Sequence, residues 1–144
     1  MTVAPEVDVE DLVIAYLTAQ NIVPAGQVSS RMLDNPPLPF VLIQRVAGGD
    51  DYLVDHPTVS VHTFNLTQTA ASDVSRQIHH AMRQLRAKTP VTMPDSSVVI
   101  PYGPARTEQT PIYMPWEPGG GGAVMDRYVA RYLINLRLPS ISAF

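Results

Sequence analysis

The chain has 144 residues, of which 45% are hydrophobic and 16% are charged, and its formal net charge is −3. That length favours one domain, and the apolar fraction can supply a buried core, which excludes an intrinsically disordered chain. The sequence has no cysteine, so disulfide scaffolds, thiolate zinc sites, iron–sulfur ligation and thiol catalysis are excluded. The absence of cysteine also fits a reducing cytosol.

The charges are unevenly distributed along the chain. Residues 1–73 contain nine acidic residues against two arginines, whereas residues 74–144 contain four acidic residues against eight basic ones. Such a chain could stack on copies of itself, although unpaired solvated surfaces would give the same pattern. The N-terminal residues are acidic, unlike a secretory signal, and the longest apolar runs are too short to span a bilayer, so we expect neither export nor membrane insertion.

Apolar spacing predicts two helices. The first covers about residues 6–20, where apolar residues recur every three or four positions and form one stripe that we expect to face a sheet. The second covers about residues 70–87, with Thr69 placed to cap its start and Pro90 to stop it. Its apolar positions repeat with the same helical period.

Alternating and β-branched residues predict the strands. Residues 40–47 and 58–65 should pair antiparallel across a turn at 48–51, and residues 97–100 form a short strand candidate. The segment 126–138 alternates almost without a break and could extend roughly 40 Å, so this strand must be central, bent or projecting. The fold expected is α+β, with a single mostly antiparallel sheet of about four strands and two helices on one face. The uncovered face would bear the arginines.

The segment 101–125 is not expected to form a helix or a strand. It contains five prolines and four consecutive glycines, which predicts a long, mobile loop before the last strand of a single 1–144 domain. An apolar cluster within it could form an exposed hook that orders against a partner; alternatively, Trp116 folds back onto its own core. Together with three arginines of the last strand, this cluster makes up the candidate interface: Ile112, Tyr113, Met114, Trp116, Arg127, Arg131 and Arg137.

The sequence offers little sign of chemistry. It has no GxSxG elbow, no phosphate-binding GxxxxGK[ST] loop, no HExxH and no spaced cysteine–histidine set. Ser60 and His62 share a strand face, but nothing marks a nucleophile, and the adjacent His79 and His80 point apart on a helix and cannot share a metal. The arginines could bind phosphate, yet the net acidic chain favours solvated or intersubunit arginines. We therefore expect no catalytic, cofactor-binding or metal-binding residue, and no enzyme.

Three features carry a family resemblance. The strand DHPTVSVHTFN is followed by TAASDVSRQIHHAMRQL, and the closing strand MDRYVARYLINLRLP comes after a long variable loop. In the order of its elements and the residue pattern of its strands, over about residues 6–138, the chain resembles the tail terminator (tail completion) proteins of long-tailed bacteriophages. Members of that family are small α+β proteins that form a hexameric ring on the finished tail tube, halt its polymerisation and present the surface that joins the filled head. The four glycines are not a feature of that family that we can assign.

The resemblance implies a structural protein with no catalytic residues and no cofactor. Its implied partners are other copies of itself in a ring, the tail tube protein and a head-side connector protein, with nucleic acid present only as DNA passing through the ring. Its implied location is the neck end of the phage tail in the virion, after assembly in the host cytoplasm. Two alternatives stay open: another phage neck component, such as a head-closure or connector protein, and a soluble binding module or small enzyme.

Overall fold

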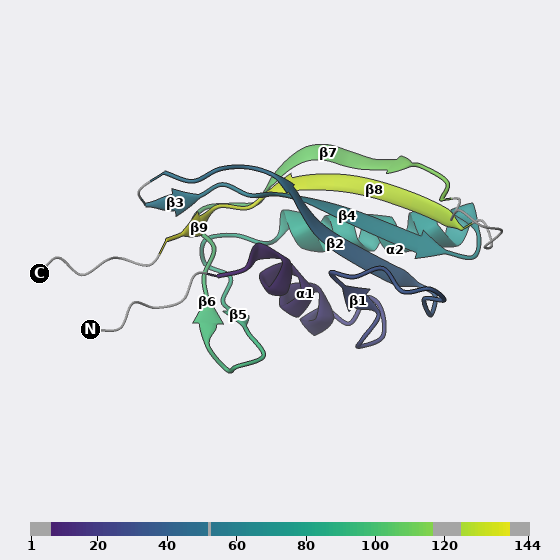
Figure 1. The fold of residues 1–144 in the computed structure, drawn as a ribbon, viewed down its shortest axis with the longest axis horizontal. Coiled ribbons are helices and arrows are strands. Elements are labelled where there is room, and N and C mark those ends of the chain that lie inside the picture. The colour runs from purple at the N-terminus through teal and green to yellow at the C-terminus, as the bar shows by residue number, and fades with distance from the viewer. Residues whose placement is uncertain (1–6, 52, 117–124, 139–144) are drawn as a thin grey trace, which may run out of the picture.

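The computed structural model of the chain describes residues 7–51, 53–116 and 125–138. Its elements follow in the order α1 (Val9–Ala19), β1 (Val28–Ser29), β2 (Phe40–Ala47), β3 (Val54–Asp55), β4 (Thr58–Asn65), α2 (Gln68–Arg83), β5 (Val91–Thr92), β6 (Val98–Val99), β7 (Arg106–Tyr113), β8 (Asp126–Leu133) and β9 (Leu136–Arg137). A five-stranded sheet has the order β1-β2-β4-β8-β7, and β3-β9 and β5-β6 form two small sheets. The predicted α+β class, with two helices and a mostly antiparallel sheet, is confirmed, but the main sheet has five strands rather than four (Figure 1).

Strand alternation decides which side of the sheet meets the helices. On β4, Val59 and Val61 point towards the main core, whereas Phe64 belongs to a separate cluster on the other face. Both helices contribute to the main core, and the Tyr16 hydroxyl of α1 donates a 2.6 Å hydrogen bond to the Ala81 carbonyl oxygen of α2. The two helices therefore share one core with one face of the sheet, as the apolar stripes predicted.

Side-chain caps fix where the helices begin. The Asp8 carboxylate accepts a 2.8 Å hydrogen bond from the Glu10 amide at the start of α1. The Thr67 hydroxyl accepts one of 3.1 Å from the Ala70 amide at the start of α2. The predicted cap at Thr69 is therefore wrong by two residues. Thr67 follows the end of β4 by two residues, so the helix begins there, and the Thr67 side chain accepts a hydrogen bond from a first-turn amide that has no partner within the helix.

The prediction that residues 101–125 form an unstructured loop is wrong over β7. This strand lies at the edge of the sheet and pairs antiparallel with β8, from Arg106 opposite Leu133 to Tyr113 opposite Tyr128. An edge position explains why Pro111 is tolerated, since an edge strand need not donate all of its amides to a ladder. At the irregular part of the pairing, the Gln109 side chain donates a 3.2 Å hydrogen bond to the Val129 carbonyl oxygen. The part of the predicted loop that contains the four glycines, 119–122, lies outside the described residues.

The last predicted strand, 126–138, is divided in two. β8 ends at Leu133, and β9 then pairs with β3, where Leu136 lies opposite Asp55. Between them the Ile134 amide donates to the Pro57 carbonyl oxygen at 3.0 Å, so the β4–β8 pairing runs on into the β3–β9 pairing in the same register. The predicted apolar face is nevertheless correct, because Tyr132, Ile134 and Leu136 are all buried. The segment is thus central over β8 and continues beyond it as β9 beside β3.

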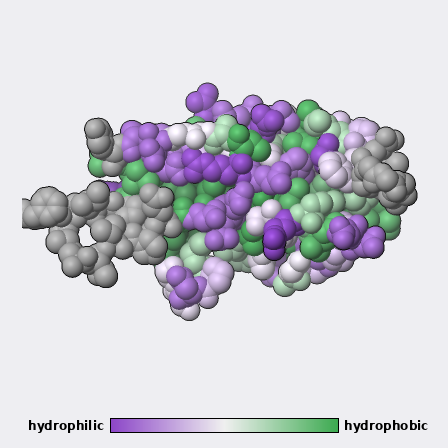
Figure 2. Space-filling model, in the orientation of Figure 1, coloured by the Kyte–Doolittle hydropathy of each residue, from purple (hydrophilic) through white to green (hydrophobic). Residues whose placement is uncertain are grey.

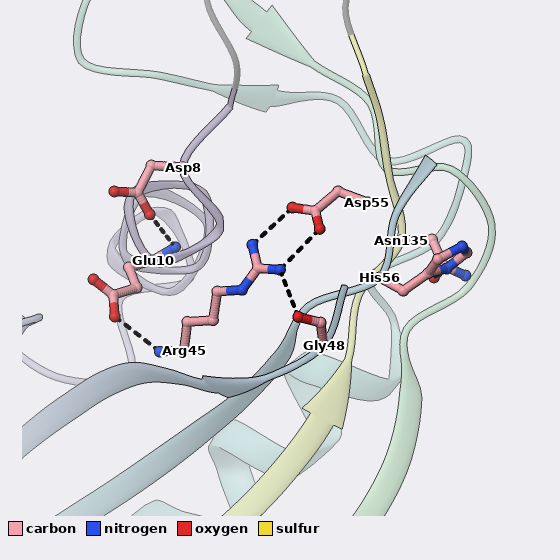
Figure 3. A network of polar contacts seen from close by, with 7 residues as sticks. All are labelled: Asp8, Glu10, Arg45, Gly48, Asp55, His56 and Asn135. Atoms are coloured by element: carbon pink, nitrogen blue, oxygen red, sulfur yellow. Dashed lines mark hydrogen bonds and ion pairs between the residues drawn. The ribbon is translucent and has the colours of Figure 1, made fainter. Parts of the chain in front are cut away.

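The β2–β4 connection forms an arm that projects from one end of the sheet (Figure 1). Inside it, the Arg45 guanidinium donates two hydrogen bonds to the Asp55 carboxylate, at 2.8 and 2.9 Å, and a third to the Gly48 carbonyl oxygen (Figure 3). The Glu10 carboxylate of α1 accepts a 2.8 Å hydrogen bond from the Arg45 backbone amide. The arm is thereby fixed through Arg45 to β2, which Glu10 joins to α1. The sequence predicted no such role for these charges.

Gly48 is the position in this arm where a side chain cannot fit. Its φ is +107°, and an added Cβ would lie 2.0 Å from the His56 carbonyl oxygen. We expect Gly48→Ala to lower the free energy of unfolding by about 2–4 kcal/mol, since it combines left-handed strain with a backbone clash. Gly26→Ala is the matched control: its φ is +89° with no atom within 4 Å of an added Cβ, so about 1 kcal/mol is expected. Urea denaturation of both variants measures the difference, and equal losses would contradict the clash.

Candidate protein–protein interface

Three consecutive apolar residues are exposed where β7 ends. Ile112, Tyr113 and Met114 keep 45%, 38% and 41% of their surface accessible, and we call them the apolar row. Ile112 lies opposite Val129 in the sheet register, and the Met114 amide donates a 2.7 Å hydrogen bond to the Arg127 carbonyl oxygen. The backbone of the row is therefore held in or beside the β7–β8 ladder. Because successive strand residues alternate, Ile112 and Met114 lie on one side of the sheet edge and Tyr113 on the other. Exposed apolar side chains on a fixed backbone are typical of a protein-binding surface.

Tyr113 is oriented by two contacts. Its ring lies 5.6 Å, centroid to centroid, from the ring of Tyr128 on the neighbouring strand. Its hydroxyl donates a hydrogen bond to the Asp126 carboxylate, and this bond raises the pKa of Tyr113 above its ordinary value. The side chain is thus set in one direction while more than a third of it stays accessible.

Trp116 does not belong to an exposed hook. Its indole meets the Phe64 ring edge-on at 6.1 Å and packs against the small cluster of Phe40, Leu42 and Phe64 on the sheet face away from the helices. Its backbone pairs with Met125 through hydrogen bonds of 2.9 and 3.0 Å. The hook interpretation is wrong for Trp116, and the alternative, that Trp116 folds back, describes it. Phe40 and Phe64 are neighbours in the β2–β4 register and provide the apolar surface it needs.

Arg127 fastens Trp116 from the other side. Its guanidinium carbon lies 5.1 Å from the centre of the Trp116 ring, a cation–π arrangement. Its Nε donates a 3.0 Å hydrogen bond to the Met114 carbonyl oxygen, so one side chain contacts both the tryptophan and the apolar row. Burial lowers the pKa of Arg127. Arg127 is therefore a support for the surface rather than a free basic group.

The structure separates the three candidate arginines. Arg131 is exposed on the same face of β8 as Arg127 and lies opposite Ser60 in the register. Arg137 is exposed on β9, beyond the break between β8 and β9, where it lies opposite Val54 of the arm. All three alternate along the chain with the core residues Tyr132, Ile134 and Leu136, so they lie on the side of the strand away from the helices, as expected. Only Arg127 lies at the apolar row.

The sheet face away from the helices also brings Ser60 and His62 together. The Ser60 hydroxyl lies 2.8 Å from His62 Nε2, but Ser60 is 2% exposed and so cannot be reached by a substrate. His62 Nδ1 is buried and has no hydrogen-bond partner among the described residues, so the third member of a catalytic triad is not in place there. Burial, with the charges of Arg127 and Arg131, lowers the pKa of His62 to about 4. This pair is part of the sheet's packing.

Two other kinds of site can be assessed over the described ranges, 7–51, 53–116 and 125–138. No three histidine, aspartate or glutamate side chains come together there in a way that could hold a metal ion. Within the same ranges, no helix is long and apolar enough to cross a membrane.

Comparison with known proteins gives no further guide. No protein-family model matches the chain, and no curated protein matches it. The assignment of the surface therefore depends on the geometry of the chain itself. The sequence predicted the apolar row and Trp116 together as an interface. It did not predict that the row is exposed while Trp116 packs on the sheet and anchors the segment.

The chain has a single tryptophan, so its fluorescence reports directly on the anchor. We expect the Trp116 emission of the folded protein to be blue-shifted and protected from acrylamide, because the indole packs on Phe64. Phe64→Ala should shift the emission to the red and expose the indole to the quencher. Leu66→Ala is the control, since Leu66 follows β4 closely but is 78% exposed. A wild-type emission like that of the unfolded chain would show that the anchor does not form.

Proposed function

We propose that this protein is a tail terminator of a long-tailed bacteriophage. In this role, subunits form a ring, hexameric by family resemblance, that caps the tail tube, stops its polymerisation and offers the surface to which the filled head is joined. DNA passes through the ring, and the protein stays in the virion at the neck end of the tail after assembly in the host cytoplasm. The protein acts through surface complementarity and transforms no substrate.

The observation that carries the proposal is the supported apolar row. Interface energy is concentrated in a few large side chains that are held in place before binding and become fully desolvated on contact. Tyr113 is oriented by Tyr128 and Asp126, and the backbone at Met114 is held by Arg127, which stacks on Trp116. A surface built in this way is suited to docking on another protein.

The edge of the sheet favours a protein that ends an assembly. β7 pairs irregularly with β8 at two places and contains Pro111, both of which hinder the addition of a further strand. A subunit that covers the growing surface of a tube must not offer a copy of that surface. The protected β7 edge meets this requirement, since the sheet cannot readily be extended from it.

The molecule has two separate ends, as joining two different partners requires. Hydrophobic and hydrophilic surface are both visible where β7 meets β8, and the opposite end carries the arm (Figures 1 and 2). The arm exposes Asp50 and Asp51 together with the apolar Leu53, and the start of α1 exposes Asp8 and Asp11. We assign the end of β7 to contacts within the capped tube and the arm to the head-side connector.

Tail-tube length is the test of this function. Tube protein from the same phage is polymerised with and without the purified chain, and the lengths are measured by negative-stain electron microscopy. We expect shorter, capped tubes in its presence. Met114→Glu should lose capping, because it places a charge in the apolar row, whereas Tyr102→Glu, at a residue 54% exposed between β6 and β7, should keep it. Tubes of unlimited length with the wild-type chain would refute termination, and binding to a connector alone would favour the head-closure alternative.

A further inference from the structure

We propose that His56 is a proton-dependent lock that holds the arm, residues 48–57 between β2 and β4, against the junction of β8 and β9. His56 Nδ1 lies 2.7 Å from Asn135 Oδ1, and His56 Nε2 lies 3.3 Å from Asp51 Oδ2. Asp51 belongs to the turn of the arm, whereas Asn135 lies between β8 and β9, where Figure 3 shows it next to His56. The ring therefore joins the arm to the body of the fold through side chains.

The two partner atoms are both hydrogen-bond acceptors. A carboxylate oxygen and an amide carbonyl oxygen accept hydrogen bonds and donate none. A neutral imidazole carries a single N–H, so it donates to one of them only, whereas the imidazolium carries two. With Asn135 Oδ1 and Asp51 Oδ2 facing the ring as observed, the protonated form of His56 satisfies both contacts. Loss of the proton leaves a nitrogen lone pair facing an oxygen, so one side of the lock opens.

The Asp51 carboxylate is a fixed acceptor on the arm. Its Oδ1 atom accepts 2.8 Å hydrogen bonds from the Leu53 and Val54 amides, which leaves Oδ2 for His56. These backbone hydrogen bonds, and after them the bond from His56, lower the pKa of Asp51. Asp51 therefore stays ionised over the whole range in which a histidine titrates, so the proton that opens and closes the lock is the one on His56.

Asn135 is the end of the lock that is fixed to the sheet. Its carbonyl oxygen accepts a 2.9 Å hydrogen bond from the Tyr102 amide, and the preceding Ile134 amide donates to the Pro57 carbonyl oxygen at 3.0 Å. A ring that binds the Asn135 side chain is therefore tied to a backbone that is held on both sides. The ladder that attaches the arm is short, because β3 and β9 pair over two residues each. A contact that depends on a proton can thus change how firmly the arm is held.

The surroundings of His56 favour its protonated form. The hydrogen bonds to Asn135 and Asp51 raise the pKa of His56 above its ordinary value of 6.5, and the charges of Asp51 and Asp55 raise it further, against a lowering by desolvation. A group whose pKa is raised by folding stabilises the fold below its unfolded value and stops doing so as the pH rises through the folded value. The lock is therefore closed below about pH 6.5 and opens above it. The other charged residues on neighbouring elements are Asp50 of the arm, Arg45 of β2, Glu108 of β7 and Arg137 of β9.

An NMR titration of the histidine rings tests the contacts of the lock. We expect the His56 pKa to lie above 6.5 in the wild type and to fall in Asp51→Asn, which keeps an acceptor for the two backbone amides of the turn but removes the charge facing the ring. Asn135→Ala should lower it as well. His80, which is exposed on α2, is the reference, and its titration curve should be the same in all three proteins. A His56 pKa that neither substitution changes would overturn the lock.

Hydrogen exchange measures whether the proton holds the arm. The reporters are the Asp51 and Leu138 amides, which donate to the Val54 and Leu53 carbonyl oxygens. From about pH 5.5 to 8.5, after division by the intrinsic exchange rates, their protection should fall about two- to fivefold in the wild type and stay constant in His56→Gln, which cannot titrate. The Met125 amide, at the other end of β8, should not respond in either protein. Equal pH dependence of the reporters in both proteins would refute the lock. Neither measurement uses tail tubes, so the lock and the proposed terminator role can fail independently.

Discussion

The edge-to-face contact between Trp116 and Phe64 decides how the end of the β7–β8 hairpin is held. Phe64 is buried on the sheet face away from the helices, next to Phe40, so the indole meets a surface that the central strands have already formed. Arg127 then stacks on the indole and binds the Met114 carbonyl oxygen. A proline-rich segment that would otherwise be free is in this way tied to the sheet, and Ile112, Tyr113 and Met114 are presented on a fixed backbone.

The same sheet separates two kinds of surface. One face is filled by α1 and α2, and the other is covered at one end by the small cluster around Phe64. At the opposite end, the bidentate pair of Arg45 and Asp55 holds the projecting arm, with its exposed acidic residues, against the body. Each end is thus braced by its own interaction, so the two ends can serve different partners without sharing residues.

The sequence predicts what depends on local periodicity. The helices and the strands around residues 40–47 and 58–65 follow from apolar spacing, and they appear close to the expected positions. β7 was not predicted, because Pro111 and the neighbouring prolines indicate a loop unless the strand is known to lie at an edge. The anchoring of Trp116 depends on Phe64, 52 positions earlier, and the Arg45–Asp55 pair depends on the turn between them. Such contacts arise from tertiary pairing, which spacing along one chain does not contain.

The apolar row is proposed as a docking surface that becomes covered on assembly. Hydroxyl-radical footprinting can check this, since tyrosine and methionine side chains report their own accessibility when the free protein is compared with the protein bound to tail tubes. We expect Tyr113 and Met114 to become protected on the tube, while Tyr102, which is exposed away from the row, keeps its reactivity. Unchanged oxidation of Tyr113 and Met114 on capped tubes would show that the row stays open to solvent and is not the docking surface.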